Sequence, residues 1–443
     1  MNVAPPKRNK IELSHYNFKK DIANRALLSK LNQHDIAILV EIVNGSLKIS
    51  LDSLAQALDC SQESIENLAK IIEPTGLLKL EQGALSVDKD VRKYFECLLA
   101  RFEEGFDPDL DHIQGLMQQV PIHVLPVWYT LPKNTDKIFP AIVEKVLHNP
   151  KCYIKHLQEL PFECEAAERT IDDVHASQDL SLPSALIKEK YKLTDDAFME
   201  CMLYLEYSLL CYCVYIPKDS GFEERVVPLH EWAQLIRFQR ENACNPIEKP
   251  SLIERTHPSD FGYVEELTQA LKALGKEGKD PKEPLQKEIV SKLLSLSLIE
   301  ESHGTYKVTQ AGLEFTAKTP QEKAMTLYLS AMNRLRRSQG IYSDKDIREI
   351  ERCLKRIVKT GWVLLDDFLK GACASVGNMP PVTLVKKGKR WSFALPQYNE
   401  EERRFVTDCL MGFFYESALT ATGSIQGKPC FTLTPFGCSI IGE

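Results

Sequence analysis

The spacing of apolar residues predicts a helix, a hairpin and the start of a second helix in the later part of the chain. In "LQKEIVSKLLSLSLIEESHGTYKVTQAGLEF" (285–315), Ile289 and Leu293 recur at helical spacing, and a short strand follows at 298–299. "SHG" predicts a turn and "TYKV" a returning strand. Thr309 then caps the next helix, because a hydroxyl oxygen accepts N–H groups that have no partner inside the helix.

The end of the chain repeats this pattern. "EERRFVTDCLMGFFYESAL" is predicted to be helical, "TATGSIQGKP" to be rich in turns, and "CFTLTPFGCSII" to return as a strand. Thr434 is the candidate cap, and Pro435 occupies the first helical position, where its missing N–H has no cost. Gly312 and Gly437 hold equivalent places, and we expect their lack of a side chain to let the new helix approach the hairpin closely.

Two earlier segments follow the same plan. One has a turn at Asp59–Cys60, a second helix capped by Ser61 and the hairpin "GLLKLEQGALSV". The other has Thr194 as the cap and "PKDSG" as the hairpin turn. Helix, turn, helix and two-stranded hairpin is the plan of a winged helix. Copies near 32–96, 181–240, 285–318 and 362–443 therefore predict a mainly α protein with short β-hairpins, built of tandem winged-helix domains joined by helical segments.

With 443 residues the chain exceeds one ordinary core, so several domains are expected. The predicted domains are 1–110, an N-terminal winged helix with a basic leader; 111–245, a helical segment and the second winged helix; 246–320, the third winged helix; and 321–443, a basic helical segment and the C-terminal winged helix. "LGKEGKDPKEP" (274–284) predicts a linker or long loop, and residues 130–180 are expected to be helical.

Charge is unevenly distributed along the chain. Residues 31–319 hold 30 basic and 47 acidic residues, whereas residues 320–404 hold 17 basic and 10 acidic residues. This asymmetry indicates two types of partner. The polar start and the absence of a long apolar stretch favour a cytoplasmic protein with no membrane partner.

The sequence contains no motif typical of an enzyme. It lacks the phosphate-binding loop G-x-x-x-x-G-K-[ST], and the motifs G-x-G-x-x-G, H-E-x-x-H and G-x-S-x-G. Cys211 and Cys213 lack the C-x-x-C spacing of a metal site, and the adjacent aspartates are typical of helix starts. We therefore predict no catalytic residues, no metal and no cofactor, although an enzyme with an unrecognised site stays open.

Basic residues gather between 334 and 390. The run "SDKDIREIERCLKRIVKTG" predicts a helix with Ser343 and Asp346 as its capping box, an apolar stripe on one face and a cationic stripe on another. "NRLRRSQG" precedes it, and a predicted hairpin, "TLVKKGKRWSF", follows it. The candidate nucleic-acid-binding residues are Arg334, Arg336, Arg337, Arg348, Arg352, Lys355, Arg356, Lys359, Lys386, Lys387, Lys389 and Arg390. A solvated surface whose arginines are paired by Glu349 and Glu351 is the alternative. Trp362 and Trp391 are expected to pack in the fold and not to stack on bases.

The last eighty residues resemble a known family. "GWVLLDDFLK" (361–370), "RWSFALPQYNEEERRFVTDCLMGFF" (390–414) and "FTLTPFGCSII" (431–441) occur in the order seen in winged-helix repeats of bacterial proteins related to the XPB-type helicase amino-terminal region. The resemblance implies a DNA-associated setting and brings no catalytic residues. Without the phosphate loop, the chain resembles the accessory array without the helicase motor.

The second helices of the first two copies predict a different partner. The helix at 61–73 carries Glu63 and Glu66, and the one after Thr194 carries Asp195, Asp196, Glu200 and Glu206, which DNA phosphates would repel. We expect the basic C-terminal region to bind DNA phosphates with low sequence specificity and the acidic N-terminal body to bind a protein, in transcription, repair or chromosome handling. The alternative is a protein-interaction scaffold that makes no nucleic-acid contact.

Overall fold

The computed structural model describes residues 11–442 except 82, 133, 163–164, 220, 276–285, 303–304, 338–339 and 389. These residues form a mainly helical chain with small antiparallel sheets, which confirms that part of the predicted fold class. The chain divides into two compact units, one of residues up to Arg237 with 384–393, and one of 238–383 with 394 onward. Each unit holds two of the four predicted copies. Residues 384–393, predicted within the last domain, belong to the first unit.

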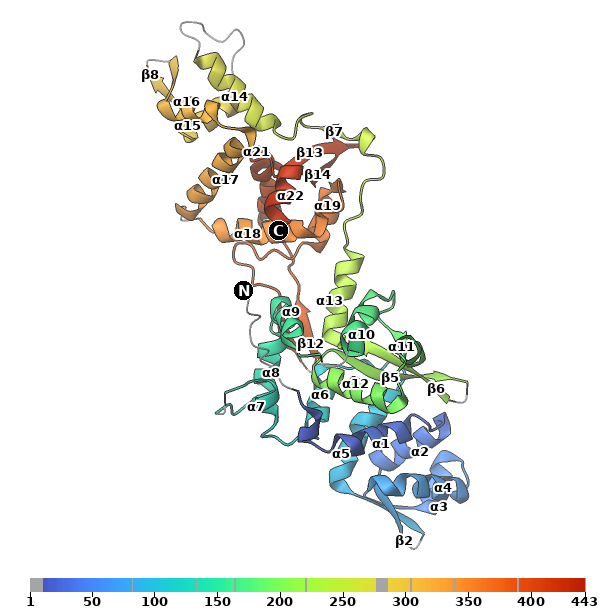
Figure 1. The fold of residues 1–443 in the computed structure, drawn as a ribbon. Coiled ribbons are helices and arrows are strands. Elements are labelled where there is room, and N and C mark those ends of the chain that lie inside the picture. The colour runs from blue at the N-terminus through green and yellow to red at the C-terminus, as the bar shows by residue number, and fades with distance from the viewer. Residues whose placement is uncertain are drawn as a thin grey trace. The chain divides into compact units, whose positions relative to one another are not determined.

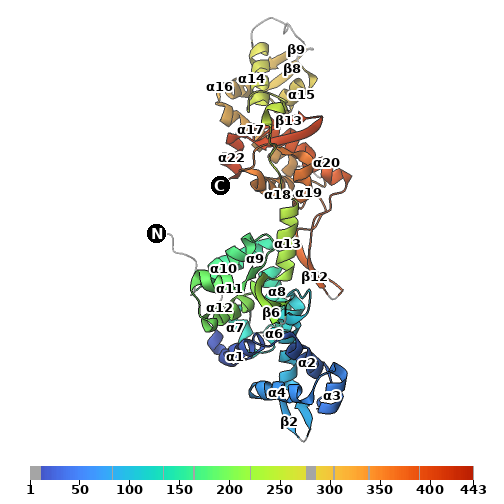
Figure 2. The same cartoon turned by 90° about the vertical axis from the view of Figure 1, so that its right-hand side faces the viewer.

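Among the described residues, the first unit contains helices from η1 to α13 and three small sheets (Figures 1 and 2). Its helices are η1 (Leu13–His15), α1 (Phe18–Leu28), α2 (Gln33–Asn44), α3 (Leu51–Leu58), α4 (Gln62–Ile72), η2 (Glu73–Thr75), α5 (Lys89–Leu99), η3 (Ala100–Phe102), α6 (Leu110–Met117), α7 (Leu125–Trp128), α8 (Ile138–Leu147), α9 (Pro150–Glu159), α10 (Glu165–Ala176), α11 (Ser184–Tyr191), α12 (Asp195–Tyr207) and α13 (His230–Glu241), the last of which crosses the division. Its strands are β1 (Lys48–Ser50), β2 (Leu78–Glu81), β3 (Ala84–Val87), β4 (Leu182–Pro183), β5 (Cys211–Lys218), β6 (Gly221–Pro228), β11 (Thr383–Lys387) and β12 (Arg390–Ala394). Helices α8, α9 and α10 confirm the helical prediction for 130–180.

The first two copies share one element order: strand, helix, helix, hairpin, helix. β1 pairs with β3 beside β2, and β4 pairs with β6 beside β5, all antiparallel. The two helices of each copy meet at a residue with left-handed backbone, Asp59 (φ 49°) or Lys192 (φ 53°). The predicted caps are confirmed, since Ser61 accepts from the Ser64 N–H and Thr194 from the Ala197 N–H.

The second unit contains the other two copies (Figures 1 and 2). Its helices are η4 (Pro250–Leu252), α14 (Gly262–Leu274), α15 (Lys287–Ser295), α16 (Gln310–Ala317), α17 (Pro320–Arg337), α18 (Asp344–Leu354), η5 (Lys355–Ile357), α19 (Leu365–Gly371), α20 (Glu400–Asp408), the π-helix η6 (Cys409–Phe413), α21 (Phe414–Glu416) and α22 (Pro435–Ile441). Its strands are β7 (Glu254–Arg255), β8 (Ile299–Ser302), β9 (Thr305–Val308), β10 (Val363–Leu364), β13 (Thr420–Ile425) and β14 (Lys428–Leu433). The predicted linker at 274–284 lies almost entirely outside the described residues.

One backbone junction recurs in all four copies. After the second helix, a residue with left-handed backbone is followed by a buried leucine whose carbonyl accepts the N–H group that opens the next helix. The leucines are Leu77, Leu210, Leu298 and Leu419, and the donors are the N–H groups of Asp88, Leu229, Thr309 and Thr434, at 2.8, 3.0, 3.0 and 3.1 Å. The left-handed residues before them are Gly76, Leu209, Ser297 and Ala418. The junction therefore ties the start of each hairpin to the helix that follows it.

The paired threonines and glycines of the last two copies belong to this junction. Thr309 accepts from the Gly312 N–H at 3.1 Å, and Thr434 from the Gly437 N–H at 2.8 Å, which confirms both predicted caps. A Cβ at either glycine would overlap the carbonyl oxygen of the junction leucine. The expected close approach of helix and hairpin is therefore confirmed, and only glycine permits it.

The fourth copy differs from the sequence prediction in its hairpin. "TATGSI", predicted as turn, forms strand β13, and the turn is confined to Gln426 and Gly427, both with positive φ. β13 lies between β14 and β7, in a sheet of order β10-β14-β13-β7. The segment is paired on both sides, and Thr420 and Thr422 are buried, so it is a central strand. Threonine is β-branched and favours strands, which suits this position.

Candidate nucleic-acid interface

The structure divides the predicted basic residues between the two units. Lys386, Lys387 and Arg390 lie on the β11–β12 hairpin in the first unit, whereas those from Arg334 to Lys359 lie in the second. Lys389 lies outside the described residues. The predicted set is therefore two groups on two separate bodies.

The β11–β12 hairpin is anchored in the first unit. The Leu384 N–H donates to the His148 carbonyl at 2.8 Å, and Phe393 packs edge-on against Trp232. Lys386 pairs with Asp111 at 3.3 Å and lies over the Trp391 ring. Lys387 and Arg390 are exposed on this hairpin.

Trp391 and Trp362 are partly covered by the protein, in keeping with a packing role. The Trp391 indole nitrogen is buried and lacks a hydrogen-bond partner among the described residues. In the second unit, the Arg255 guanidinium lies 5.7 Å from the centre of the Trp362 ring. Trp362 also accepts, through its carbonyl, a hydrogen bond from the Ile247 N–H at 2.8 Å.

Helix α18 forms as its sequence predicts. Ser343 and Asp346 make the capping box, and the apolar stripe is buried through Ile347, Ile350 and Leu354. Gly361 follows the last turn with φ 79°. The local pattern is therefore sufficient to specify this helix and the face that it buries.

The cationic face of α18 is largely neutralised within the second unit. Asp344 pairs with Arg336 at 3.2 Å and with Arg348 at 3.8 Å, and Glu349 pairs with Arg352. Among the predicted residues that follow, Lys355 and Lys359 are exposed, and neither has an ion pair with any described residue.

Arg356 is directed into the fold, in contrast to its predicted place in the cationic stripe. Its guanidinium donates to the Asn242 carbonyl at 2.7 Å and lies over the Phe368 ring. The 3-10 turn η5 changes the helical phase at this point, and Gly371 leaves the space that the guanidinium fills. Arg356 therefore serves packing in the second unit.

The last turn of α17 presents its arginines on two faces. Arg336 turns towards Asp344, whereas Arg334 and Arg337 line a cavity of about 740 Å³ between α17 and α15. Both of these arginines are exposed, and no described residue forms an ion pair with either of them. The spacing of three residues places them on one helical face.

Helix α15 supplies the opposite wall of this cavity. Lys292 and Arg334 together line three adjoining depressions, of about 740, 610 and 480 Å³, and Lys287 lines the second of them. Lys292 pairs with Glu416 of α21, so part of its charge is compensated. We call the space lined by Lys287, Lys292, Arg334 and Arg337 the α15–α17 groove.

Lys287 and Lys292 were missed by the sequence prediction. They lie on the second helix of the third copy, the position that carries the recognition helix in a winged helix. A comparison of this helix across all copies would have found them, because α15 carries lysines where α4 and α12 carry mainly acidic residues.

One acidic residue expected on the surface of the second copy is buried. Glu206 accepts from Arg25 Nη1 at 2.7 Å and from Arg101 Nη1 and Nη2 at 2.7 and 2.8 Å. Asp21 pairs with the same Arg25 at 2.7 Å. Glu206 therefore belongs to the core of the first unit, because its residue spacing places it on the inner face of α12.

The described residues contain no group of three His, Cys, Asp or Glu side chains placed to hold a metal ion. No helix in the same part of the chain is long and apolar enough to cross a membrane. Burial raises the pKa of the Cys211 and Cys213 thiols well above their usual range, so both stay protonated.

No protein-family model matches this chain, and no curated protein is significantly similar to it.

Proposed function

We propose that the protein is a non-enzymatic, DNA-associated protein whose second unit binds the phosphate backbone through the α15–α17 groove. The observation that carries the proposal is that Arg334 lines one depression with Lys287 and Lys292, beside Glu288 and Glu416, and lines the adjoining one with Arg337 and Lys292. Arg334 and Arg337 form no ion pair with any described residue, so they are free to neutralise phosphates, and each phosphate contact releases condensed counterions. Few directed base contacts are expected from such a groove, so sequence specificity is low.

The repeated element order supports a tandem winged-helix assignment, and with it the kinship to accessory arrays of XPB-type helicases. In the third copy, α14 and α15 are the two helices, β8 and β9 form the wing, and α15 is the recognition helix. The wing of this copy is a two-stranded sheet, whereas β7 and β10 flank the hairpin of the fourth copy. The third copy is therefore the one whose helix and wing best suit DNA contact.

The first unit is assigned to protein binding in transcription, repair or chromosome handling. Helix α4 exposes Glu63 and Asn67, and next to them Ile71 is an exposed apolar residue. An acidic and an amide side chain beside an exposed aliphatic one suit a basic protein surface and not DNA.

A protein-interaction scaffold without nucleic-acid contact is the second candidate. The ion pairs of Arg336, Arg348 and Arg352 favour it, since they show that much of the basic segment is neutralised within the fold.

The test is binding of the full chain to a duplex DNA of mixed sequence over a salt series. We expect log affinity to fall linearly with log salt, with a slope of about 0.9 per phosphate contacted. The double variant Arg334→Gln/Arg337→Gln should bind more weakly and reduce the slope by about 1 to 2. The matched control is Lys19→Gln/Lys20→Gln on α1, which removes two exposed cations without ion pairs among the described residues from the first unit and should leave the slope unchanged.

Two outcomes would contradict the proposal. Failure of the unaltered protein to bind at roughly 50 mM salt would favour the scaffold. An equal loss in both double variants would show that net charge, and not the groove, attracts the DNA.

A further inference from the structure

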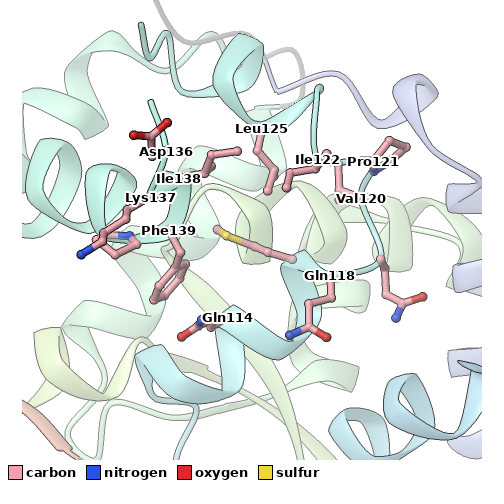
Figure 3. A pocket seen from close by; sticks show the side chains of 13 residues that line it. Gln114, Gln118, Val120, Pro121, Ile122, Leu125, Asp136, Lys137, Ile138 and Phe139 are labelled. Carbon is pink, nitrogen blue, oxygen red and sulfur yellow. The ribbon is translucent and has the colours of Figure 1, made fainter. Parts of the chain in front are cut away.

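The first unit contains a cavity that DNA binding does not use. It lies between α6, the start of α7 and the start of α8, and has a volume of about 630 Å³ (Figure 3). Sites for small molecules typically measure about 300 to 1,000 Å³, so the cavity has the size of a ligand site.

The inner wall of the cavity is apolar. It is lined by Met117, Val120 and Leu125, three side chains that are almost fully buried in the first unit. At the rim, Ile122 is 72% exposed, and Phe139 lies on another side of the opening (Figure 3). An apolar ligand would remove these side chains from water, which favours its binding.

Uncharged amide groups form most of the polar lining. Gln114 and Gln118 lie on the α6 side, across the opening from Ile122 and Leu125 (Figure 3). The structure shows no hydrogen bond from either side-chain amide to another described residue. A glutamine side chain has an NH2 group that donates and a carbonyl oxygen that accepts. Gln114 and Gln118 together can therefore hydrogen-bond both the N–H and the carbonyl of a ligand amide.

The charged groups at the cavity cancel each other. Asp136 and Lys137 are adjacent in the chain, both are exposed, and both line the same end of the opening. The single cation, Lys137, lies beside the carboxylate of Asp136, so an anionic ligand would gain little attraction. It would also lose hydration against the apolar wall, which costs free energy. The lining therefore favours a neutral ligand.

We propose that this cavity is a binding site for a neutral, mainly apolar small molecule that carries an amide group. The apolar part lies against Met117, Val120 and Leu125, and the amide pairs with Gln114 and Gln118. The inference is independent of DNA binding, because all its residues lie in the first unit.

The test uses acetanilide, a neutral aromatic amide, as the probe and benzoate as a charged comparison of similar size. Binding to the full chain is measured by saturation-transfer NMR and calorimetry. We expect acetanilide to bind at least tenfold more tightly than benzoate. Gln114→Trp places a large side chain over the opening and should weaken acetanilide binding at least tenfold.

The matched control is Gln56→Trp, which makes the same change at an exposed position of α3 outside the cavity. It should leave the affinity unchanged, and circular dichroism confirms that both variants fold. The proposal is overturned if acetanilide does not bind, if both variants weaken it equally, or if benzoate binds as tightly.

Discussion

Glu206 should be among the residues most sensitive to substitution in the first unit. Its side chain is 1% exposed and lies between two guanidinium groups, those of Arg25 and Arg101, at 2.7 Å from each. Replacement by Gln keeps the shape and removes the charge. Arg25 keeps Asp21 as a partner, but Arg101 is left as a buried cation that pairs with no other described residue. A buried charge without its partner costs about 3–5 kcal/mol, so Glu206→Gln should lower the free energy of unfolding by that amount.

Urea unfolding monitored by circular dichroism measures this loss. Glu200→Gln is the matched control, because Glu200 is exposed on the same helix, and its loss should be within about 0.5 kcal/mol. Adding Arg101→Met to Glu206→Gln removes the orphaned cation and should recover at least about 1 kcal/mol. A loss below about 1 kcal/mol for Glu206→Gln, or no recovery in the double variant, would refute the reasoning.

The same carboxylate predicts a pH dependence. Burial raises the pKa of Glu206, but the Arg101 and Arg25 guanidiniums outweigh this effect and lower it to about 2. A carboxyl whose pKa is lowered on folding stabilises the protein above its unfolded pKa, near 4.5, and this stability is lost as the pH falls towards 2. The difference in stability between the unaltered protein and Glu206→Gln should therefore shrink over that range.

Two further predictions concern the junction and a second buried carboxyl. Gly437→Ala should destabilise the second unit by at least about 2 kcal/mol, because its Cβ would overlap the Leu419 carbonyl oxygen. The control is Gly412→Ala, where an added Cβ meets no atom within 4 Å and should cost little stability. The urea unfolding assay measures both variants. Burial raises the pKa of Glu231 to about 7, and one oxygen accepts the Leu110 N–H at 3.1 Å. The stability that the protonated Glu231 contributes is therefore complete below about pH 4.5 and is lost as the pH rises through 7. Glu231→Gln cannot ionise, so the variant should not lose this stability over that range. Equal profiles of stability against pH for the unaltered protein and the variant would contradict the prediction.

Features set by near neighbours in the chain could be predicted from the sequence. The caps at Ser61, Thr194, Thr309 and Thr434 depend on a hydroxyl and an N–H group three residues later, so the local pattern is sufficient. The buried stripe of α18 follows from helical periodicity in the same way.

Features set by distant partners could not be predicted. Strand β13 is central because β7, more than 160 residues earlier, pairs with its outer edge. Arg356 turns inward because a 3-10 turn alters the phase and because Asn242 and Gly371 provide an acceptor and space. The α15–α17 groove likewise joins residues of two helices whose proximity no local pattern expresses.

The four copies share one junction, so their differences decide where DNA is expected to bind. In the first two copies a single left-handed residue joins the two helices. In the fourth, residues 372–399 separate α19 from α20, and part of this insertion, 384–393, belongs to the first unit. A recognition helix needs its partner helix to hold it against the phosphate backbone, and in the fourth copy a segment of the first unit comes between the two helices along the chain. The resemblance that pointed to DNA is concentrated in the fourth copy, but the helix that we propose for recognition, α15, lies in the third. The proposed binding therefore depends on the lysines and arginines of the α15–α17 groove and not on the family resemblance.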